Sequence, residues 1–277
     1  MEDVLARIAA ALERLAPPLP EDAPMSDDGA YLWAGGVLRR ARAFDPLPLA
    51  ALIGVDAQKA ALAENSRRHA ASLPAHDALL WGARGAGKSA LVKAATAAHG
   101  LTLIETPRDE LASLPRLFDR LAAAPQRFVL FADDLSFDGD RAAAKALRSL
   151  LEGGVEARPL NCRLYVTSNR RHLVERSIAE NDPVNPRDAA DDALALADRF
   201  GLSLGFHAVD EATYLAIAHA YAERHGLPWS EADALSFAHA RGSRSGRVAW
   251  QWAVDAAGRA GVALHAGSTV MPADDAT

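Results

Sequence analysis

A run of eight residues offers the clearest chemistry in this sequence, because its glycines and its lysine have the spacing of a phosphate-binding loop. The run fits the pattern GxxxxGKS/T and reads Gly82-Ala83-Arg84-Gly85-Ala86-Gly87-Lys88-Ser89. Glycines let successive backbone N–H groups turn inward toward a β-phosphate, and a helix beginning at the end of the loop adds the positive end of its dipole. We predict that these residues and Ala90 contact a nucleotide, that Lys88 reaches the β- and γ-phosphates, and that Ser89 binds Mg²⁺. The alternative is a glycine-rich turn between a strand and a helix, and a phosphate loop alone does not separate kinases, GTPases and ATPases.

Two carboxylates and an amide follow apolar runs further along the chain. Asp133 and Asp134 end the run 127–132 and are followed, one strand later, by Asn169. We predict that Asp133 holds Mg²⁺ through the shell around Ser89, and that Asp134 positions and polarises the attacking water. Many ATPases have Glu at this second position, and Asp is one methylene shorter. Asn169 fits a polar amide that touches both the γ-phosphate and the water; ordinary turns after two strands are the alternative.

Other kinds of site are not supported by the sequence. The nine histidines are scattered without a zinc-type pattern, so we expect no metal besides Mg²⁺. The single cysteine, Cys162, cannot form an internal disulfide, which fits a reducing cytosol. No Ser-His-Asp or Cys-His arrangement has a recognisable local signature.

Composition limits the class of protein and its partners. The 277 residues are 50% hydrophobic and 24% charged, as in globular domains with a full core rather than in disordered or disulfide-stapled chains. A net charge of −6 does not support a nucleic-acid partner, although short basic clusters at 67–69 and 170–172 leave one open. No apolar run reaches the length of a membrane span and the N-terminus lacks a basic signal region, so we expect a cytoplasmic protein that does not associate with membranes.

The elements that must position these residues read as an α/β core followed by helices. Apolar runs at 78–81, 101–105, 127–132, 163–167 and 202–206 alternate with helical stretches at 55–70, 88–99, 109–123 and 140–152. This alternation predicts a parallel sheet covered by helices on both faces. Three further helices are expected at 210–225, 229–240 and 245–263. We divide the chain into an N-terminal helical extension and linker (1–50, with a helix at 4–15 and an irregular or helical part at 21–50), the α/β core (51–207), a helical lid (208–265) and a flexible tail (266–277).

The motifs in this order resemble the AAA+ ATPases, and within them a branch of bacterial P-loop proteins catalogued as a domain of unknown function, near the helicase-loader and initiator group. The resemblance spans roughly residues 50–260 and rests on the segments LLWGARGAGKSALVKA, RFVLFADDLSF, KALRSLLEGGVEARPLN, YVTSNRRHL, DRFGL and RGSRSGRVA. It implies that Arg199 is an arginine finger supplied to the nucleotide of a neighbouring subunit. It also implies that Arg247 is the lid arginine called sensor 2, with Arg244 as the alternative, and that residues 52–54 line an adenine pocket.

These assignments predict an enzyme that binds ATP with Mg²⁺ and couples hydrolysis to the remodelling or loading of a macromolecular partner. A finger supplied in trans implies a homo-oligomer, and an unidentified protein is the expected further partner, with the long acidic segment 177–197 as a candidate contact. Two alternatives stay open: a slowly hydrolysing nucleotide-dependent switch or adaptor, which the shorter Asp134 favours, and a small-molecule P-loop kinase.

Overall fold

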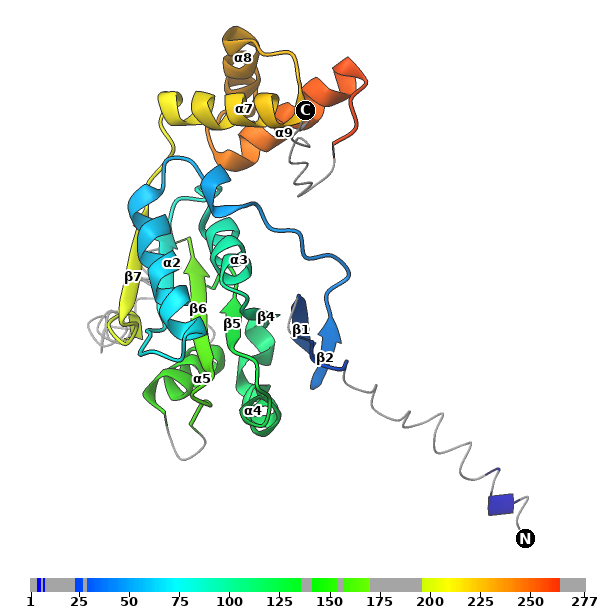
Figure 1. Cartoon of the computed structure of the whole chain (residues 1–277), viewed down its shortest axis with the longest axis vertical. Coiled ribbons are helices and arrows are strands. Elements are labelled where there is room, and N and C mark those ends of the chain that lie inside the picture. The colour runs from blue at the N-terminus through cyan, green and yellow to red at the C-terminus, as the bar shows by residue number, and fades with distance from the viewer. Residues whose placement is uncertain are drawn as a thin grey trace, which may run out of the picture.

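A computed structural model describes residues 4, 5, 7, 23–26, 29–135, 141–153, 157–169 and 196–264 of the chain. Its centre is a seven-stranded sheet in the order β2-β1-β4-β5-β6-β3-β7 (Figure 1). The strands are β1 (Ala30–Ala34), β2 (Val37–Arg40), β3 (Ala78–Gly82), β4 (Thr102–Glu105), β5 (Phe128–Ala132), β6 (Cys162–Ser168) and β7 (Leu202–Phe206). Every pairing is parallel except that of β1 with β2. The predicted α/β fold with a mostly parallel sheet is therefore confirmed.

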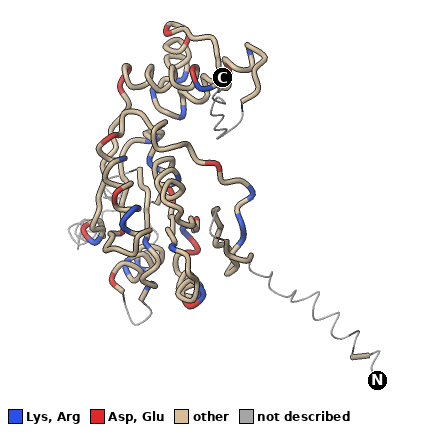
Figure 2. The backbone as a smooth tube through the Cα atoms, viewed as in Figure 1, with Lys and Arg blue, Asp and Glu red and all other residues tan. Residues whose placement is uncertain are grey.

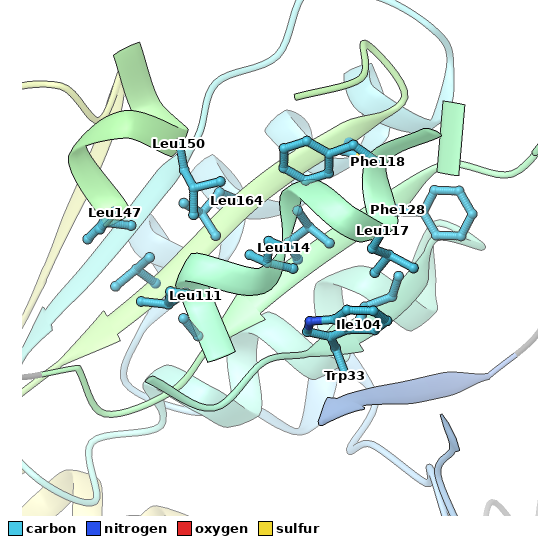
Figure 3. Packing of buried hydrophobic residues seen from close by; sticks show 14 of the residues in the cluster. Trp33, Ile104, Leu111, Leu114, Leu117, Phe118, Phe128, Leu147, Leu150 and Leu164 are labelled. Carbon is cyan, nitrogen blue, oxygen red and sulfur yellow. The ribbon is translucent and has the colours of Figure 1, made fainter. Parts of the chain in front are cut away.

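Helices cover both faces of the sheet because its inner strands are apolar on both sides. In β5, Phe128 and Leu130 join one cluster of buried side chains, whereas Val129 and Phe131 join the other. This alternation is what the two-residue period of a strand requires of a doubly covered sheet. The first face packs against η2 (Arg108–Ser113), α4 (Pro115–Ala122) and α5 (Arg141–Glu152), and the second against α2 (Asp56–Ala70) and α3 (Lys88–Ala98). Figure 3 shows the leucines of η2 and α4 over Trp33, Ile104 and Phe128.

Two elements differ from the sequence predictions. Residues 30–34 and 37–40 were expected to be irregular or helical, but they form β1 and β2, and β1 pairs in parallel with β4. The glycines at 35 and 36 both have positive φ and close the hairpin tightly. The single helix expected at 109–123 is instead a 3-10 segment followed by a helix that starts at Pro115, because proline is favoured in a first turn and disfavoured inside a helix.

The C-terminal region is helical, as predicted, and Figure 1 shows it gathered at one end of the molecule above α2 and α3. Its helices are α7 (Glu211–His225), α8 (Glu231–Arg241) and α9 (Gly246–Ala260). Each starts at a side-chain cap, from Asp210, Ser230 or Ser245, and ends at a left-handed glycine. Trp252 is fully buried at the centre of their shared core, whereas Trp250 packs at its edge against Tyr221. Only one of these two tryptophans therefore faces the core, as their spacing on a helix predicts.

Some sequence predictions lie outside the described residues. They are the basic cluster at 170–172, most of the acidic segment 177–197, the tail 266–277 and nearly all of the helix expected at 4–15, of which residues 4, 5 and 7 are helical. Within the described ranges, no helix is both long and apolar enough to cross a lipid bilayer. Basic and acidic side chains are interspersed over most of the core and the lid, apart from a short basic run at residues 39–42 (Figure 2).

Candidate nucleotide-binding site

The predicted phosphate loop lies between β3 and α3, at the carboxyl end of the central strands. Gly82, Gly85 and Gly87 all have positive φ, at 126°, 72° and 94°, which is the backbone curvature that their glycines were predicted to allow. Gly82 also has no room for a side chain, because a Cβ there would lie 1.9 Å from the carbonyl oxygen of Phe206 in β7. The loop is thus fixed against a neighbouring strand at its first residue.

Lys88 begins α3 and points back into this loop. Its ammonium donates to the carbonyl oxygens of Gly82 and Ala83, each at 2.8 Å, and to the side-chain oxygen of Asn169 at 3.1 Å. Burial lowers the pKa of Lys88, and the charges of Asp134 and Asp133 act in the opposite direction. The structure therefore brings Lys88 and Asn169 together, and holds a cation where the loop opens.

Asp133 lies at the end of β5 and faces Ser89. The Ser89 hydroxyl donates to the Asp133 carboxylate at 2.6 Å. A second hydroxyl, that of Thr167 at the end of β6, donates to the same carboxylate oxygen and accepts from the backbone N–H of Asp134 at 2.8 Å. No sequence motif indicated Thr167, although its spacing of two residues from Asn169 places both side chains on one side of the strand.

Asp134 and Asn169 form a second polar pair beside the first. The amide of Asn169 donates to the Asp134 carboxylate, so the two predicted hydrolytic residues are in direct contact. Asp134 has φ of 51°, a left-handed conformation that few non-glycine residues adopt and that short polar residues tolerate best. Such backbone strain persists where the surrounding structure enforces it, often at functional sites.

These side chains surround one cavity of about 460 Å³ at the meeting point of core and lid. The lid contributes through α9, since the N–H of Gly246 donates to the carbonyl oxygen of Gly85 at 3.0 Å. Arg247, the next residue, lines the cavity. Arg244 does not line it and is paired instead with Glu211 at 2.5 Å. The cavity is lined by Arg84, Gly85, Gly87, Lys88, Ser89, Ala90, Asp133, Asp134, Thr167, Asn169 and Arg247.

A second, more apolar cavity of about 250 Å³ adjoins the first. It shares Gly85, Gly87 and Ala90 with the first cavity, and most of its other lining residues belong to 51–55, to the end of β7 and the residues that follow it, and to α7. The stretch 52–54, for which the family resemblance implies an adenine pocket, lies here. Ala83 and Ala86 belong to the loop, and Ala86 is buried against this second cavity.

Arg199, the predicted finger, lies far from this site. It precedes β7, and the N–H of Leu202, the first residue of β7, donates to the carbonyl oxygen of Asp77 just before β3. Because β7 and β3 are parallel, Arg199 lies at the amino-terminal end of these strands, whereas the phosphate loop follows their carboxyl end. A five-residue strand spans about 16 Å at its usual rise per residue, so Arg199 cannot reach the cavity of its own subunit. Its guanidinium instead donates to the Glu152 carboxylate at the end of α5.

The donor set fits a magnesium ion that shares its coordination with phosphates. The Ser89 hydroxyl and Asp133 carboxylate are hard oxygen ligands beside the loop, and Mg²⁺ usually binds proteins through one or two such groups together with substrate phosphates. The described residues contain no cluster of three or more His, Cys, Asp or Glu that would form a metal site without a phosphate. The residues present therefore fit Mg²⁺ as a companion of a bound nucleotide.

Comparison with solved structures identifies the class of fold. A point mutant of RuvB from Thermotoga maritima aligns over 76% of this chain with a TM-score of 0.53 and 19% sequence identity. A structure of the T. maritima RuvB Holliday junction branch migration motor has a TM-score of 0.47, with 14% identity over 76% of this chain and 72% of its own. The FIGL-1 AAA domain in complex with ADP has a TM-score of 0.46, with 17% identity over 68% of this chain and 65% of its own. The alignment with the RuvB point mutant shows a fold like that of RuvB, with a mostly parallel α/β core followed by a helical lid, and the chain spans 64% of the length of that structure.

The sequence itself places the chain in a family. The family model described as "Protein of unknown function (DUF815)" matches residues 26–260, which is most of the chain, so this protein belongs to the DUF815 family. No curated protein matches the sequence.

Proposed function

We propose that this protein is an ATPase of the AAA+ type, which binds ATP with Mg²⁺ and couples its hydrolysis to the remodelling or loading of a macromolecular partner. The observation that carries the proposal is the convergence of Lys88, the Ser89–Asp133 pair, the Asp134–Asn169 pair and Arg247 on one cavity. A cavity that only bound phosphate would not need the second carboxylate, whose role in hydrolysis is to orient water.

Each residue has a distinct task in this mechanism. The loop N–H groups and the Lys88 ammonium would hold the β- and γ-phosphates and neutralise charge that moves onto them during transfer. Ser89 and Asp133 would hold Mg²⁺, which supplies further neutralisation of the phosphates. Asp134 would accept a hydrogen bond from the attacking water, with Asn169 fixing the orientation of that carboxylate.

The test compares nucleotide binding with hydrolysis. Isothermal titration of the wild type with ATP and Mg²⁺ is expected to show binding, and Lys88→Ala is expected to abolish it. Asp134→Asn is expected to retain binding and to lower kcat by about 10²-fold or more, because general-base assistance is worth at least that much. Asp109→Asn is the matched control, since Asp109 is an exposed carboxylate away from the cavity. A wild type that binds no ATP, or an Asp134→Asn variant that hydrolyses ATP normally, would contradict the proposal.

A second candidate function is a nucleotide-dependent switch that hydrolyses slowly and recruits a partner. The contact between Asp134 and Asn169 favours it, because the shorter carboxylate is already engaged by an amide. A switch without a working catalytic acid would have the same low rate in the wild type, in Asp134→Asn and in Asp134→Glu. An ATPase limited only by side-chain length would instead speed up in Asp134→Glu.

We also propose that the protein works as a homo-oligomer in the cytoplasm. Because Arg199 cannot reach its own cavity, it can act on a phosphate only from a neighbouring subunit. We infer that the remodelled partner is a protein, because the net charge of −6 and the interspersed charges disfavour a nucleic acid. The helicase-loader and initiator group remains the closest functional analogy from the sequence motifs.

A further inference from the structure

Two arginines line the cavity of about 460 Å³ and have no carboxylate partner in the described part of the chain. They are Arg84, in the phosphate loop, and Arg247, in α9. Both side chains are exposed, and neither takes part in an ion pair or hydrogen bond among the described residues. Arg199 and Arg244 differ, since each is paired with a glutamate of its own chain.

The backbone contact between core and lid brings these two arginines to the same place. Gly85 follows Arg84, Gly246 precedes Arg247, and the two glycines are joined by the 3.0 Å hydrogen bond from the Gly246 N–H to the Gly85 carbonyl. The Cβ of Arg247 lies only 3.6 Å from the position a Cβ on Gly85 would occupy. Both guanidinium groups also lower the pKa of Lys88, which places three cations within electrostatic reach of one another.

Adjacent cations repel one another unless an anion lies between them. The side chains lining the cavity comprise three cations, Arg84, Lys88 and Arg247, and two carboxylates, which leaves an excess of one positive charge. A magnesium-bound nucleoside triphosphate carries a net charge of about −2. The cavity with Arg84 therefore neutralises more of this negative charge than the same cavity would without Arg84.

The division between the two cavities indicates which phosphate the arginines meet. Arg84 and Arg247 line the cavity that holds Asp134 and Asn169, and neither lines the apolar one. The apolar cavity suits a base, and the shared glycines of the loop lie between the two. Along a bound nucleotide, the arginines are therefore at the end where the terminal phosphate would lie.

We propose that the side chain of Arg84 acts together with Arg247, the lid arginine that the family resemblance already assigns to the phosphates, as a clamp within one subunit on the terminal phosphate of a nucleoside triphosphate. The proposal rests on the proposed function and adds to it a residue with a side-chain role, because the loop pattern accounts for Arg84 by its backbone alone. A guanidinium presents a planar fork that matches two phosphate oxygens, which a lysine cannot do. The clamp makes a single subunit selective for the triphosphate over the diphosphate before any neighbour contributes Arg199.

The experiment measures affinity for a non-hydrolysable ATP analogue and for ADP, both with Mg²⁺, at a dilution where sedimentation shows monomers. Arg84→Ala is expected to weaken binding of the ATP analogue by about 10- to 100-fold, the range for a lost charge-assisted hydrogen bond, and to change ADP affinity by less than about 3-fold. The affinity of Arg84→Lys for the ATP analogue is expected to lie between that of the wild type and that of Arg84→Ala. Because Arg84 has no partner in the described chain, these variants should unfold at the wild-type temperature, which circular dichroism checks.

Arg39→Ala is the matched control, because Arg39 is exposed on β2 and its removal lowers the net charge equally without touching the cavity. It should leave both affinities unchanged. An Arg84→Ala variant that loses ATP-analogue and ADP binding equally, or loses neither, would overturn the clamp while leaving the ATPase proposal intact. A wild type that binds neither nucleotide would instead overturn the proposed function itself.

Discussion

Replacing Gly85 by alanine should weaken the contact between the lid and the phosphate loop. Gly85 has φ of 72°, and an added Cβ would lie 2.8 Å from the Cβ of Ser245 and 2.9 Å from its hydroxyl oxygen. Ser245 is buried and caps α9 by accepting a hydrogen bond from the Val248 N–H at 3.2 Å. The new methyl group therefore presses directly on the residue that starts the lid helix carrying Arg247.

The expected cost combines two contributions. A non-glycine residue in the left-handed region costs about 1–2 kcal/mol. Displacing Ser245 far enough to relieve the contact weakens the helix cap, which is worth about 1 kcal/mol. The free energy of unfolding should thus fall by about 2–3 kcal/mol, measured by urea denaturation followed by circular dichroism.

A double-mutant cycle separates these contributions. Ser245→Gly removes both atoms that would lie closer than 3.0 Å to the new methyl group, and glycine is only slightly worse than serine at a helix cap. The pair Gly85→Ala and Ser245→Gly should therefore recover about 1 kcal/mol relative to the sum of the single variants. Gly100→Ala is the control for strain alone, because Gly100 has φ of 62° and nothing within 4 Å of an added Cβ.

The reasoning would be refuted if Gly85→Ala were no more destabilising than Gly100→Ala and the cycle showed no coupling. That result would mean that the lid yields freely at Ser245, so that the contact between Gly85 and Gly246 does not fix the position of α9.

Two further predictions concern a buried histidine and the distant arginine. His69 is fully buried with its Nε2 atom 3.0 Å from the Phe128 carbonyl oxygen, and burial lowers its pKa from 6.5 to about 4. Because the unfolded chain then binds a proton at a higher pH than the folded one, stability should be lost as pH falls from about 6.5 to 4, by up to about 3 kcal/mol. His69→Gln, which keeps a side-chain N–H donor, should remove this part of the pH dependence in urea titrations at several pH values, and an unchanged profile would show that His69 is not its source. Arg199→Ala should lower ATPase activity per subunit by about 10³-fold at concentrations that favour oligomers, without affecting ATP affinity, whereas Glu152→Gln, which breaks the same ion pair, should retain activity. Equal losses in both variants, or a wild-type rate per subunit that stays constant down to monomeric dilution, would count against a finger supplied in trans.

The parts of the fold that the sequence predicted are those where local pattern and burial agree. The run Phe128–Ala132 is apolar at every position because both faces of β5 are covered, and the following acid marks its end. The phosphate loop is equally local, since its glycines must take positive φ whatever surrounds them.

The parts that were missed depend on partners far along the chain. β1 and β2 are short, and two arginines in β2 are exposed, so the segment has no strong strand pattern of its own. β1 is a strand because its backbone pairs with β4 and because Trp33 donates to the Ser113 hydroxyl at 2.8 Å.

The site shows the same limit. Sequence spacing offered both Arg244 and Arg247 for the lid arginine, because they lie about one helical turn apart. Only the fold places Arg247, in α9, at the cavity and pairs Arg244, in the connection before α9, with Glu211 of α7. The role of Thr167 likewise depends on β6 lying beside β5, which no local pattern shows.

The position of β3 in the sheet also determines when the phosphate loop can first be held in its final shape during synthesis of the chain. The strand that leads into the phosphate loop pairs on one side with β6 and on the other with β7, and both are made long after it. The lid that closes the cavity is made later still. A nascent chain therefore carries an unpaired, apolar β3 until nearly all of the core has left the ribosome, and such exposed strands favour aggregation. A ligand of the cavity can stabilise the fold only after this interval, because the cavity is complete only when β6, β7 and the lid have been made.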